Sequence, residues 1–107
     1  MDIDQLETFL AVANYGGFHR AAESLRISQP AVSARINSLE ELLGARLFDR
    51  DHGRFSLSLA GKALRPHAEQ VLRQVAIARQ AVHELHPVAG GARKRPGGGA
   101  GPTGYRR

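Results

Sequence analysis

The order of apolar and polar residues along the chain predicts four helices and one short hairpin. In four segments, apolar side chains recur every three or four residues, the spacing that places them on one face of a helix. Between the third and fourth of these segments the pattern changes to alternation, which is typical of strands. The expected helices cover residues 4–15, 18–26, 28–43 and 58–86, and the expected hairpin covers residues 47–57.

Residues that commonly begin or end helices lie at several of these boundaries. Asp4, followed three residues later by Glu7, resembles a capping box and predicts the start of the first helix. Ser28 and Ser58 are expected to cap the third and fourth helices through their hydroxyl oxygens. Gly44 is expected to close the third helix in the left-handed conformation.

The segment 21–44 has the outline of a helix-turn-helix. The third helix carries an apolar stripe that faces inward, formed by Val32, Ile36, Leu39 and Leu43. Its outward face consists of Pro30, Ala34, Asn37 and Glu41. Because this outward face has little bulk and little charge, it can enter a groove of DNA. The hairpin that follows is expected to form a wing, with a turn at 51–53 and Arg54 near its tip.

The fourth helix carries a heptad seam, in which apolar residues are separated alternately by four and three positions. A seam of this kind predicts a partner helix, most simply from a second copy of the chain. The alternative is that the helix folds back over its own domain, but that domain is too small to cover so many turns. Pro66 is expected to bend this helix near its start. The seam residues are Leu64, Ala68, Val71, Val75, Ala78, Val82 and Leu85.

The chain of 107 residues is long enough for one small domain with an added arm. It has no cysteine, so disulfides and thiolate zinc sites are excluded. It has no apolar run long enough to span a membrane, and its acidic N-terminus does not resemble a secretory signal, so no membrane partner and a cytoplasmic location are expected. His83 and His86 are too few to hold a metal, and no metal site is expected.

The net charge of +5 does not by itself indicate nucleic-acid binding. Five of the fifteen Lys and Arg residues lie in residues 88–107, which contain no acid, and the other ten balance the ten Asp and Glu residues of 1–87. The part that is expected to fold is therefore formally neutral, and only the distribution of its charges can indicate a partner.

We expect three parts along the chain: a DNA-binding domain at 1–58, a linker and dimerisation helix at 59–87, and a disordered tail at 88–107. The tail is rich in Gly, Pro and Arg and has almost nothing apolar to bury. It fits an artefact of cloning, a frameshifted end or a natural short form equally well, and its basic residues can add salt-sensitive affinity for DNA.

The chain strongly resembles the N-terminal DNA-binding domain of LysR-type transcriptional regulators, and the resemblance covers residues 1 to about 86 without a gap. It implies a mainly α winged helix-turn-helix, with a small β-hairpin wing and a long C-terminal linker helix through which subunits dimerise. The matching stretches are Leu6-x-x-Phe9-Leu10-Ala11-Val12-Ala13, Gly17-Phe18-x-Arg20-Ala21-Ala22-x-x-Leu25, Ile27-Ser28-Gln29-Pro30-Ala31-Val32-Ser33, Leu39-Glu40-x-x-Leu43-Gly44, Leu47-Phe48-Asp49-Arg50 and Leu57-Ser58-x-Ala60-Gly61.

The resemblance implies that the third helix enters the major groove and that several of its first residues lie at the DNA. Arginines on the second helix, the third helix and the wing could meet phosphates; the alternative for each is solvated charge or a surface ion pair. Ala34 departs from the family, which often has a basic residue there, and it could instead touch a thymine methyl group. The expected DNA-binding residues are Arg20, Ser28, Gln29, Pro30, Ser33, Ala34, Arg35, Asn37 and Arg54.

The expected function is sequence-specific DNA binding in transcriptional regulation, by a homodimer or higher oligomer that recognises an imperfect palindrome in double-stranded DNA. The alternative is an interaction module that dimerises with full-length relatives without reading DNA effectively itself. No pattern of catalytic residues is present, so neither an enzyme nor a cofactor is expected. The chain stops before the sensor domain that the resemblance implies, so no small-molecule effector is expected.

Overall fold

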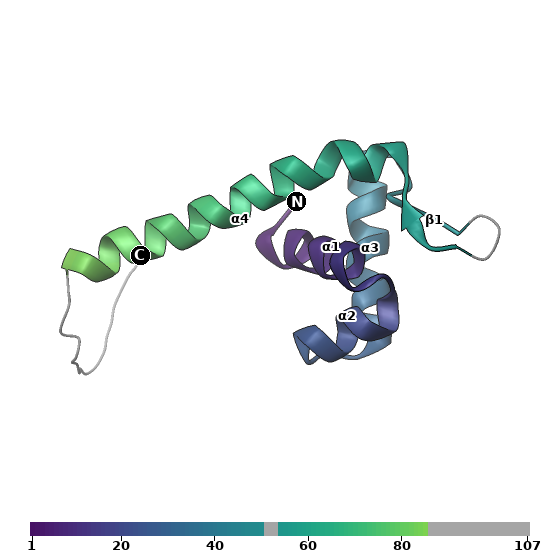
Figure 1. Cartoon of the computed structure of the whole chain (residues 1–107), viewed down its shortest axis with the longest axis horizontal. Coiled ribbons are helices and arrows are strands. Elements are labelled where there is room, and N and C mark those ends of the chain that lie inside the picture. The colour runs from purple at the N-terminus through teal and green to yellow at the C-terminus, as the bar shows by residue number, and fades with distance from the viewer. Residues whose placement is uncertain (51–53, 86–107) are drawn as a thin grey trace. The chain divides into compact units, whose positions relative to one another are not determined.

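The computed structural model of the chain describes residues 1–50 and 54–85. This part forms four helices and two short strands (Figure 1). The predicted turn at 51–53, the last predicted turn of the fourth helix and the tail at 88–107 lie outside the described residues. The elements are α1 (Ile3–Tyr15), α2 (Phe18–Leu25), α3 (Gln29–Leu43), β1 (Phe48–Asp49), β2 (Ser56–Leu57) and α4 (Leu59–Leu85).

The predicted fold class is confirmed, because three packed helices are followed by a two-stranded hairpin and a long helix. The strands β1 and β2 are antiparallel, and Phe48 pairs with Leu57 and Asp49 with Ser56. The helices α1, α2 and α3 pack against one another. The arrangement is that of a winged helix-turn-helix, with α2 and α3 as the helix-turn-helix and the hairpin as the wing.

The helix ends follow local side-chain chemistry, with one prediction wrong. The Ser28 hydroxyl caps α3 by accepting a hydrogen bond from the Ala31 N–H at 3.1 Å, and Gly44 ends it with a φ of 71°. The predicted start of α1 at Asp4 is wrong. Asp2 is the N-cap instead, because its carboxylate and the side chain of Gln5 each accept a hydrogen bond from the other's backbone N–H, at 2.8 and 2.9 Å.

The hydrophobic core lies where α1, α2 and α3 meet. Of the stripe predicted for α3, Val32, Ile36 and Leu39 are buried, whereas Leu43 is 41% exposed because α3 runs past the core before it ends. The other apolar core residues are Leu6, Phe9, Leu10, Ala11, Val12, Ala21, Ala22, Leu47, Phe48 and Ala68.

An aromatic cluster fastens the hairpin to the helices. The ring of Phe48 on β1 lies 5.5 Å from that of Phe9 on α1 and 6.1 Å from that of Phe18 on α2. Phe55 stacks on Phe48 at 5.1 Å and meets Phe18 edge to face at 5.9 Å. Contacts of this geometry stabilise a fold beyond the area that they bury. The hairpin is therefore held at a fixed position beside α2.

Ser58 joins the start of α4 to the base of the hairpin, and it is buried. Its hydroxyl donates a hydrogen bond to the Arg46 carbonyl oxygen at 2.6 Å and accepts one from the Gly61 N–H at 3.0 Å. The Ser58 N–H donates to the Leu47 carbonyl oxygen at 2.9 Å. The predicted cap of the fourth helix is confirmed.

Replacing Ser58 by alanine is expected to destabilise the domain by about 1–2 kcal/mol, because it removes a helix cap and leaves the partner of a buried hydrogen bond unsatisfied. Denaturant unfolding followed by circular dichroism measures this loss. Ser58→Thr, which carries the same hydroxyl, is the control, and an equal loss in both variants would show that the hydroxyl is not responsible.

The first turns of α4 belong to the same compact unit as the three-helix core, which extends from Met1 to Arg73. Ala68 is buried and Leu64 is half-buried against the core. Arg65 donates a hydrogen bond to the Asn14 side chain at the end of α1 and forms an ion pair with Glu69 at 3.6 Å. The fold-back alternative therefore holds in part for the first turns of α4, because the chain's own core covers Ala68 fully and Leu64 partly.

Candidate nucleic-acid interface

The outward face of α3 is open to solvent. Gln29 and Pro30 in the first turn are exposed, as are Ala34 and Asn37 further along, and Ser33 is half-buried between them. All five residues were predicted to lie at DNA, and the structure brings them together on one helix. The backbone of the first turn is fixed by the cap at Ser28, so this face is rigidly presented.

Arg35 differs from the other predicted residues of α3. Its side chain is half-buried and donates a hydrogen bond to the Thr8 hydroxyl of α1 at 3.3 Å. Thr8 is fully buried, and its own hydroxyl donates to the Asp4 carbonyl oxygen at 2.7 Å. The structure therefore gives Arg35 a contact within the protein, where it ties α3 to α1.

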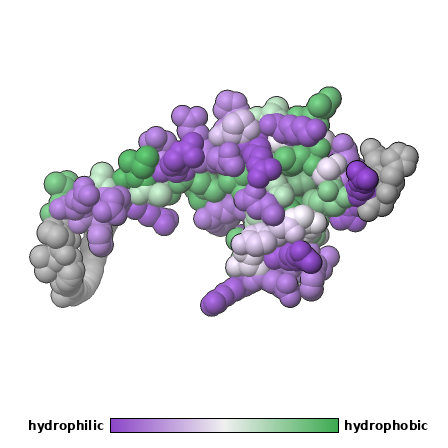
Figure 2. Space-filling view, in the orientation of Figure 1, coloured by the Kyte–Doolittle hydropathy of each residue, from purple (hydrophilic) through white to green (hydrophobic). Residues whose placement is uncertain are grey.

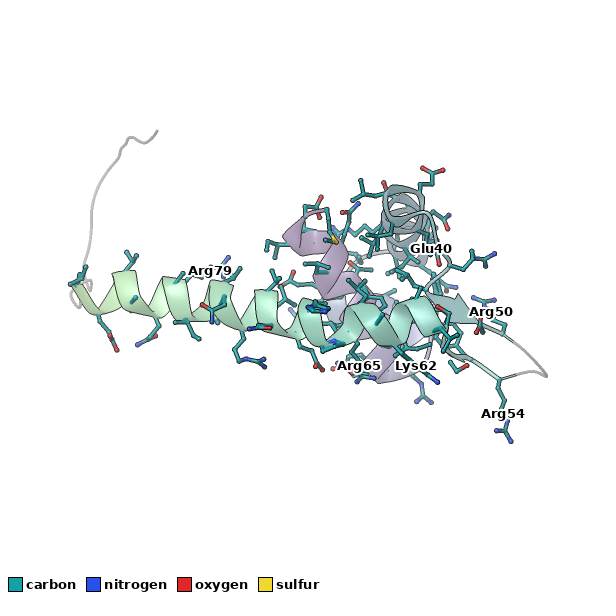
Figure 3. The ribbon with its side chains drawn as sticks, turned by 90° about the horizontal axis from the view of Figure 1, so that it is seen from above. Glu40, Arg50, Arg54, Lys62, Arg65 and Arg79 are labelled. Carbon is teal, nitrogen blue, oxygen red and sulfur yellow. The ribbon has the colours of Figure 1, made fainter. Side chains whose placement is uncertain are left out.

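The two other predicted arginines are exposed on separate elements. Arg20 lies on α2, and Arg54 directly precedes β2 on the hairpin. Figure 3 shows the Arg54 side chain extending away from the helices, at the outer part of the wing. Neither arginine takes part in an ion pair among residues 1–50 and 54–85.

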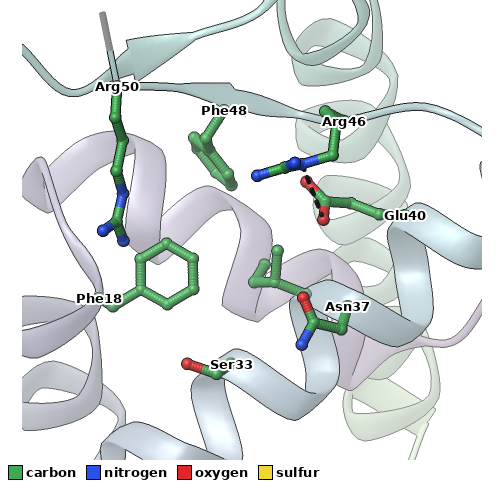
Figure 4. A pocket seen from close by; sticks show the side chains of 8 residues that line it. Phe18, Ser33, Asn37, Glu40, Arg46, Phe48 and Arg50 are labelled. Atoms are coloured by element: carbon green, nitrogen blue, oxygen red, sulfur yellow. Dashed lines mark ion pairs between the residues drawn. The ribbon is translucent and has the colours of Figure 1, made fainter.

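A cavity of about 330 Å³ lies between α3, the start of α2 and the strand β1 (Figure 4). On one side Arg46 pairs with Glu40 at 3.8 Å, and Glu40 also accepts a hydrogen bond from the Leu47 N–H at 2.8 Å. On the other side Arg50 lies beside the ring of Phe18. The lining residues are Phe18, Ser33, Ile36, Asn37, Glu40, Arg46, Phe48 and Arg50.

Arg50 was not among the predicted site residues, although its position carried a signal. It ends the stretch Leu47-Phe48-Asp49-Arg50, where it directly follows β1 and comes two residues after the buried Phe48. The sequence alone could not show two facts. The side chain of Phe48 is buried in the core, and the side chain of Arg50 lies over the ring of Phe18, in the cavity beside α3.

Apolar side chains are exposed along α4 beyond the first compact unit (Figure 2). Ile77 and Val82 are 52% and 60% exposed, and Leu85 is 77% exposed. In the first unit Val71 is 40% exposed. Val71, Val82 and Leu85 keep the heptad spacing of the seam, which is typical of a surface that meets another helix, whereas Ile77 lies outside the seam.

Two kinds of site are absent from the described part of the chain. No helix in it is both long enough and apolar enough to cross a membrane. None of its His, Asp and Glu residues gather in groups of three or more that could hold a metal ion.

Comparison with known proteins gives matches at the level of sequence and of fold. The family model of the bacterial regulatory helix-turn-helix proteins of the lysR family matches residues 3–62. A probable RuBisCO transcriptional regulator of Cyanidioschyzon merolae is 41% identical over 90 residues, which are 84% of this chain and 30% of the relative. An HTH-type transcriptional regulator from the ibpB-leuC intergenic region of Azotobacter vinelandii is 44% identical over 86 residues, which are 80% of this chain and 60% of the relative.

Among solved structures, the DNA-binding domain of CbnR in complex with DNA has a TM-score of 0.73 and 32% sequence identity, and the match covers 79% of this chain and 98% of that one. The chain thus spans less than two thirds of the length of the two regulators above and nearly all of this isolated domain. The family model covers more than half of the chain. The chain therefore belongs to the lysR family of bacterial regulatory helix-turn-helix proteins.

Proposed function

We propose that this protein is a sequence-specific DNA-binding transcriptional regulator. The observation that carries the proposal is the outward face of α3, where Gln29 offers an exposed amide and the exposed Pro30 and Ala34 beside it add little bulk. Amides of this kind hydrogen-bond to base edges in the major groove. The family and the DNA complex of the similar CbnR domain support it.

The wing and α3 contribute different contacts in this proposal. Arg54 extends from the hairpin, so it can meet the phosphate backbone or the minor groove while α3 lies in the major groove. The phosphate contacts set the register, and the side chains of α3 select the sequence.

The proposed active form is a dimer joined through α4. The exposed apolar residues Val71, Val82 and Leu85, together with Ala78 and the half-buried Val75, follow the predicted seam beyond the core. A second copy would cover them, and the two copies of α3 would then meet two half-sites of an imperfect palindrome. The symmetry of the site mirrors that of the protein.

The test is selection of duplexes from a random library by the purified full chain, followed by affinity measurements over a range of salt. We expect enrichment of an inverted repeat, with affinity for the selected duplex at least about 1,000-fold above that for random sequence. A steep salt dependence without any sequence preference would reduce the function to non-specific binding.

Gln29→Ala is expected to weaken binding to the selected duplex by about 1–3 kcal/mol, because one amide contact to a base edge is lost, and to leave the affinity for random duplex nearly unchanged. Fluorescence anisotropy with both duplexes measures the difference. Gln70→Ala makes the same change at an exposed position of α4 and should have no effect. Equal losses on both duplexes for Gln29→Ala would argue against base reading.

A second candidate function rests on Ala34. Its methyl group lies in the middle of the outward face and can neither donate nor accept a hydrogen bond, so this position of α3 cannot read the polar edge of a base. The chain would then act by forming heterodimers through α4 with full-length family members. Size-exclusion chromatography of such a mixture, with DNA binding of the heterodimer measured alongside, distinguishes the two functions.

A further inference from the structure

Arg50 is held in place by aromatic rings. Its guanidinium carbon lies 5.4 Å from the centre of the Phe18 ring and 5.6 Å from that of Phe55. The two rings meet edge to face and belong to the cluster that fixes the hairpin. A guanidinium next to aromatic rings is attracted to them through its charge, and its N–H groups stay able to donate hydrogen bonds.

The charge of Arg50 is not neutralised by any acid in the described ranges 1–50 and 54–85, whereas Arg46 on the other side of the cavity is paired with Glu40. The two arginines therefore have different roles. Arg46 helps to fix the chain before β1, and Arg50 brings an orientated positive charge to the cavity.

The wall opposite Arg50 carries polar side chains beside Ile36, and the one carboxylate among them, that of Glu40, is balanced by its ion pair with Arg46. Ser33 and Asn37 lie one helical turn apart on α3 and line the same cavity of about 330 Å³ (Figure 4). Their hydroxyl and amide groups are hydrogen-bond donors. One charged donor and two neutral donors around a small open cavity form a site for a tetrahedral oxyanion.

We propose that this cavity binds one backbone phosphate of the DNA, with Arg50 as the charged ligand and Ser33 and Asn37 as hydrogen-bond donors. The phosphate would then lie between α3 and the hairpin and fix how deeply α3 enters the groove. The aromatic rings lower the entropy that Arg50 loses on binding, because its side chain is already ordered in the free protein. This inference rests on the proposed function, since it assumes that α3 lies at DNA.

The test uses a random-sequence duplex of about 30 base pairs, because a phosphate contact is independent of sequence. The affinity of the full chain is measured over a range of salt. For Arg50→Gln, we expect weaker binding and a plot of log affinity against log salt that is less steep by about 0.9, the value for one phosphate contact. Arg50→Lys should keep the wild-type slope, because it keeps the charge.

Two further variants separate the phosphate site from a merely structural role. Arg46→Gln is the matched control and should leave the slope unchanged, because this arginine is already paired. Asn37→Ala, at an exposed position, should weaken binding roughly tenfold at constant slope, because it removes a neutral donor to a charged group.

An unchanged slope for Arg50→Gln would overturn the proposal, as would equal changes of slope in Arg46→Gln and Arg50→Gln. Failure of the proposed function can be told apart from failure of the phosphate site. If the wild type has no sequence preference but Arg50→Gln still lowers the slope, the phosphate site stands and the regulatory function falls. If the wild type binds no duplex at all, both fall.

Discussion

Replacing Gly61 by alanine is expected to destabilise the domain strongly. A Cβ atom at this position would lie 2.2 Å from the Leu47 carbonyl oxygen and 2.7 Å from a methyl carbon of Leu57. The first of these atoms belongs to the backbone and cannot rotate away. We expect a loss on the order of 3 kcal/mol or more, which lowers the unfolding temperature of a domain of this size by more than about 10 °C. Thermal unfolding followed by circular dichroism measures it.

The matched control is Gly17→Ser, because a Cβ atom at Gly17 would have no neighbour within 4 Å. Gly17 is the N-cap of α2, where serine is well accepted, so this variant should be as stable as the wild type or slightly more so. If Gly61→Ala unfolds within about 2 °C of the wild type, the close approach between α4 and the base of the hairpin is not needed for stability.

The second large effect is expected for Val82→Glu on α4. Val82 is 60% exposed and lies on the proposed dimer surface, so a carboxylate there would be buried in the dimer without a partner of opposite charge. Burying an unpaired charge is strongly unfavourable. We expect dissociation into monomers and a loss of about 100-fold or more in affinity for a selected duplex with two half-sites, because the second half-site no longer adds to binding.

Ala76→Glu is the control for this variant, because it adds the same charge at an exposed position of α4 outside the seam. It should keep the wild-type oligomeric state. Sedimentation velocity gives the mass of each variant in solution, and anisotropy gives its affinity for DNA. A Val82→Glu protein with the wild-type mass would place the dimer surface elsewhere, whatever its affinity.

The sequence predicted those parts of the fold that depend on local chemistry. Ser28, Gly44 and Ser58 lie at the ends where they were expected, because capping needs only a hydroxyl or a glycine at one position. The start of α1 was placed two residues late. Asp2 is the cap because the amide of Gln5 completes the reciprocal pair of hydrogen bonds. In the sequence, Asp4 and Glu7 have the same spacing as Asp2 and Gln5, so the two pairs look equally suitable.

The parts that depend on tertiary packing were harder to predict. A heptad spacing continues from Leu64 to Leu85, but it does not show which turns are already covered by the chain's own core. In the structure Ala68 is 1% exposed and Leu85 is 77% exposed, although both fit the same spacing. Arg50 was missed for a related reason. Its place in the site depends on Phe18, far earlier in the sequence, and on Phe55, so it becomes visible only in the folded structure.

The peptide groups of Leu47 connect three elements. Its N–H donates to Glu40 of α3, its carbonyl oxygen accepts from Ser58 at the start of α4, and its side chain is buried in the core. Gly61 packs against the same carbonyl oxygen. The first turns of α4 therefore cannot rotate unless the end of α3 moves as well. In the proposed dimer, a force on the first turns of α4 would therefore reach the reading helix α3 through this one residue.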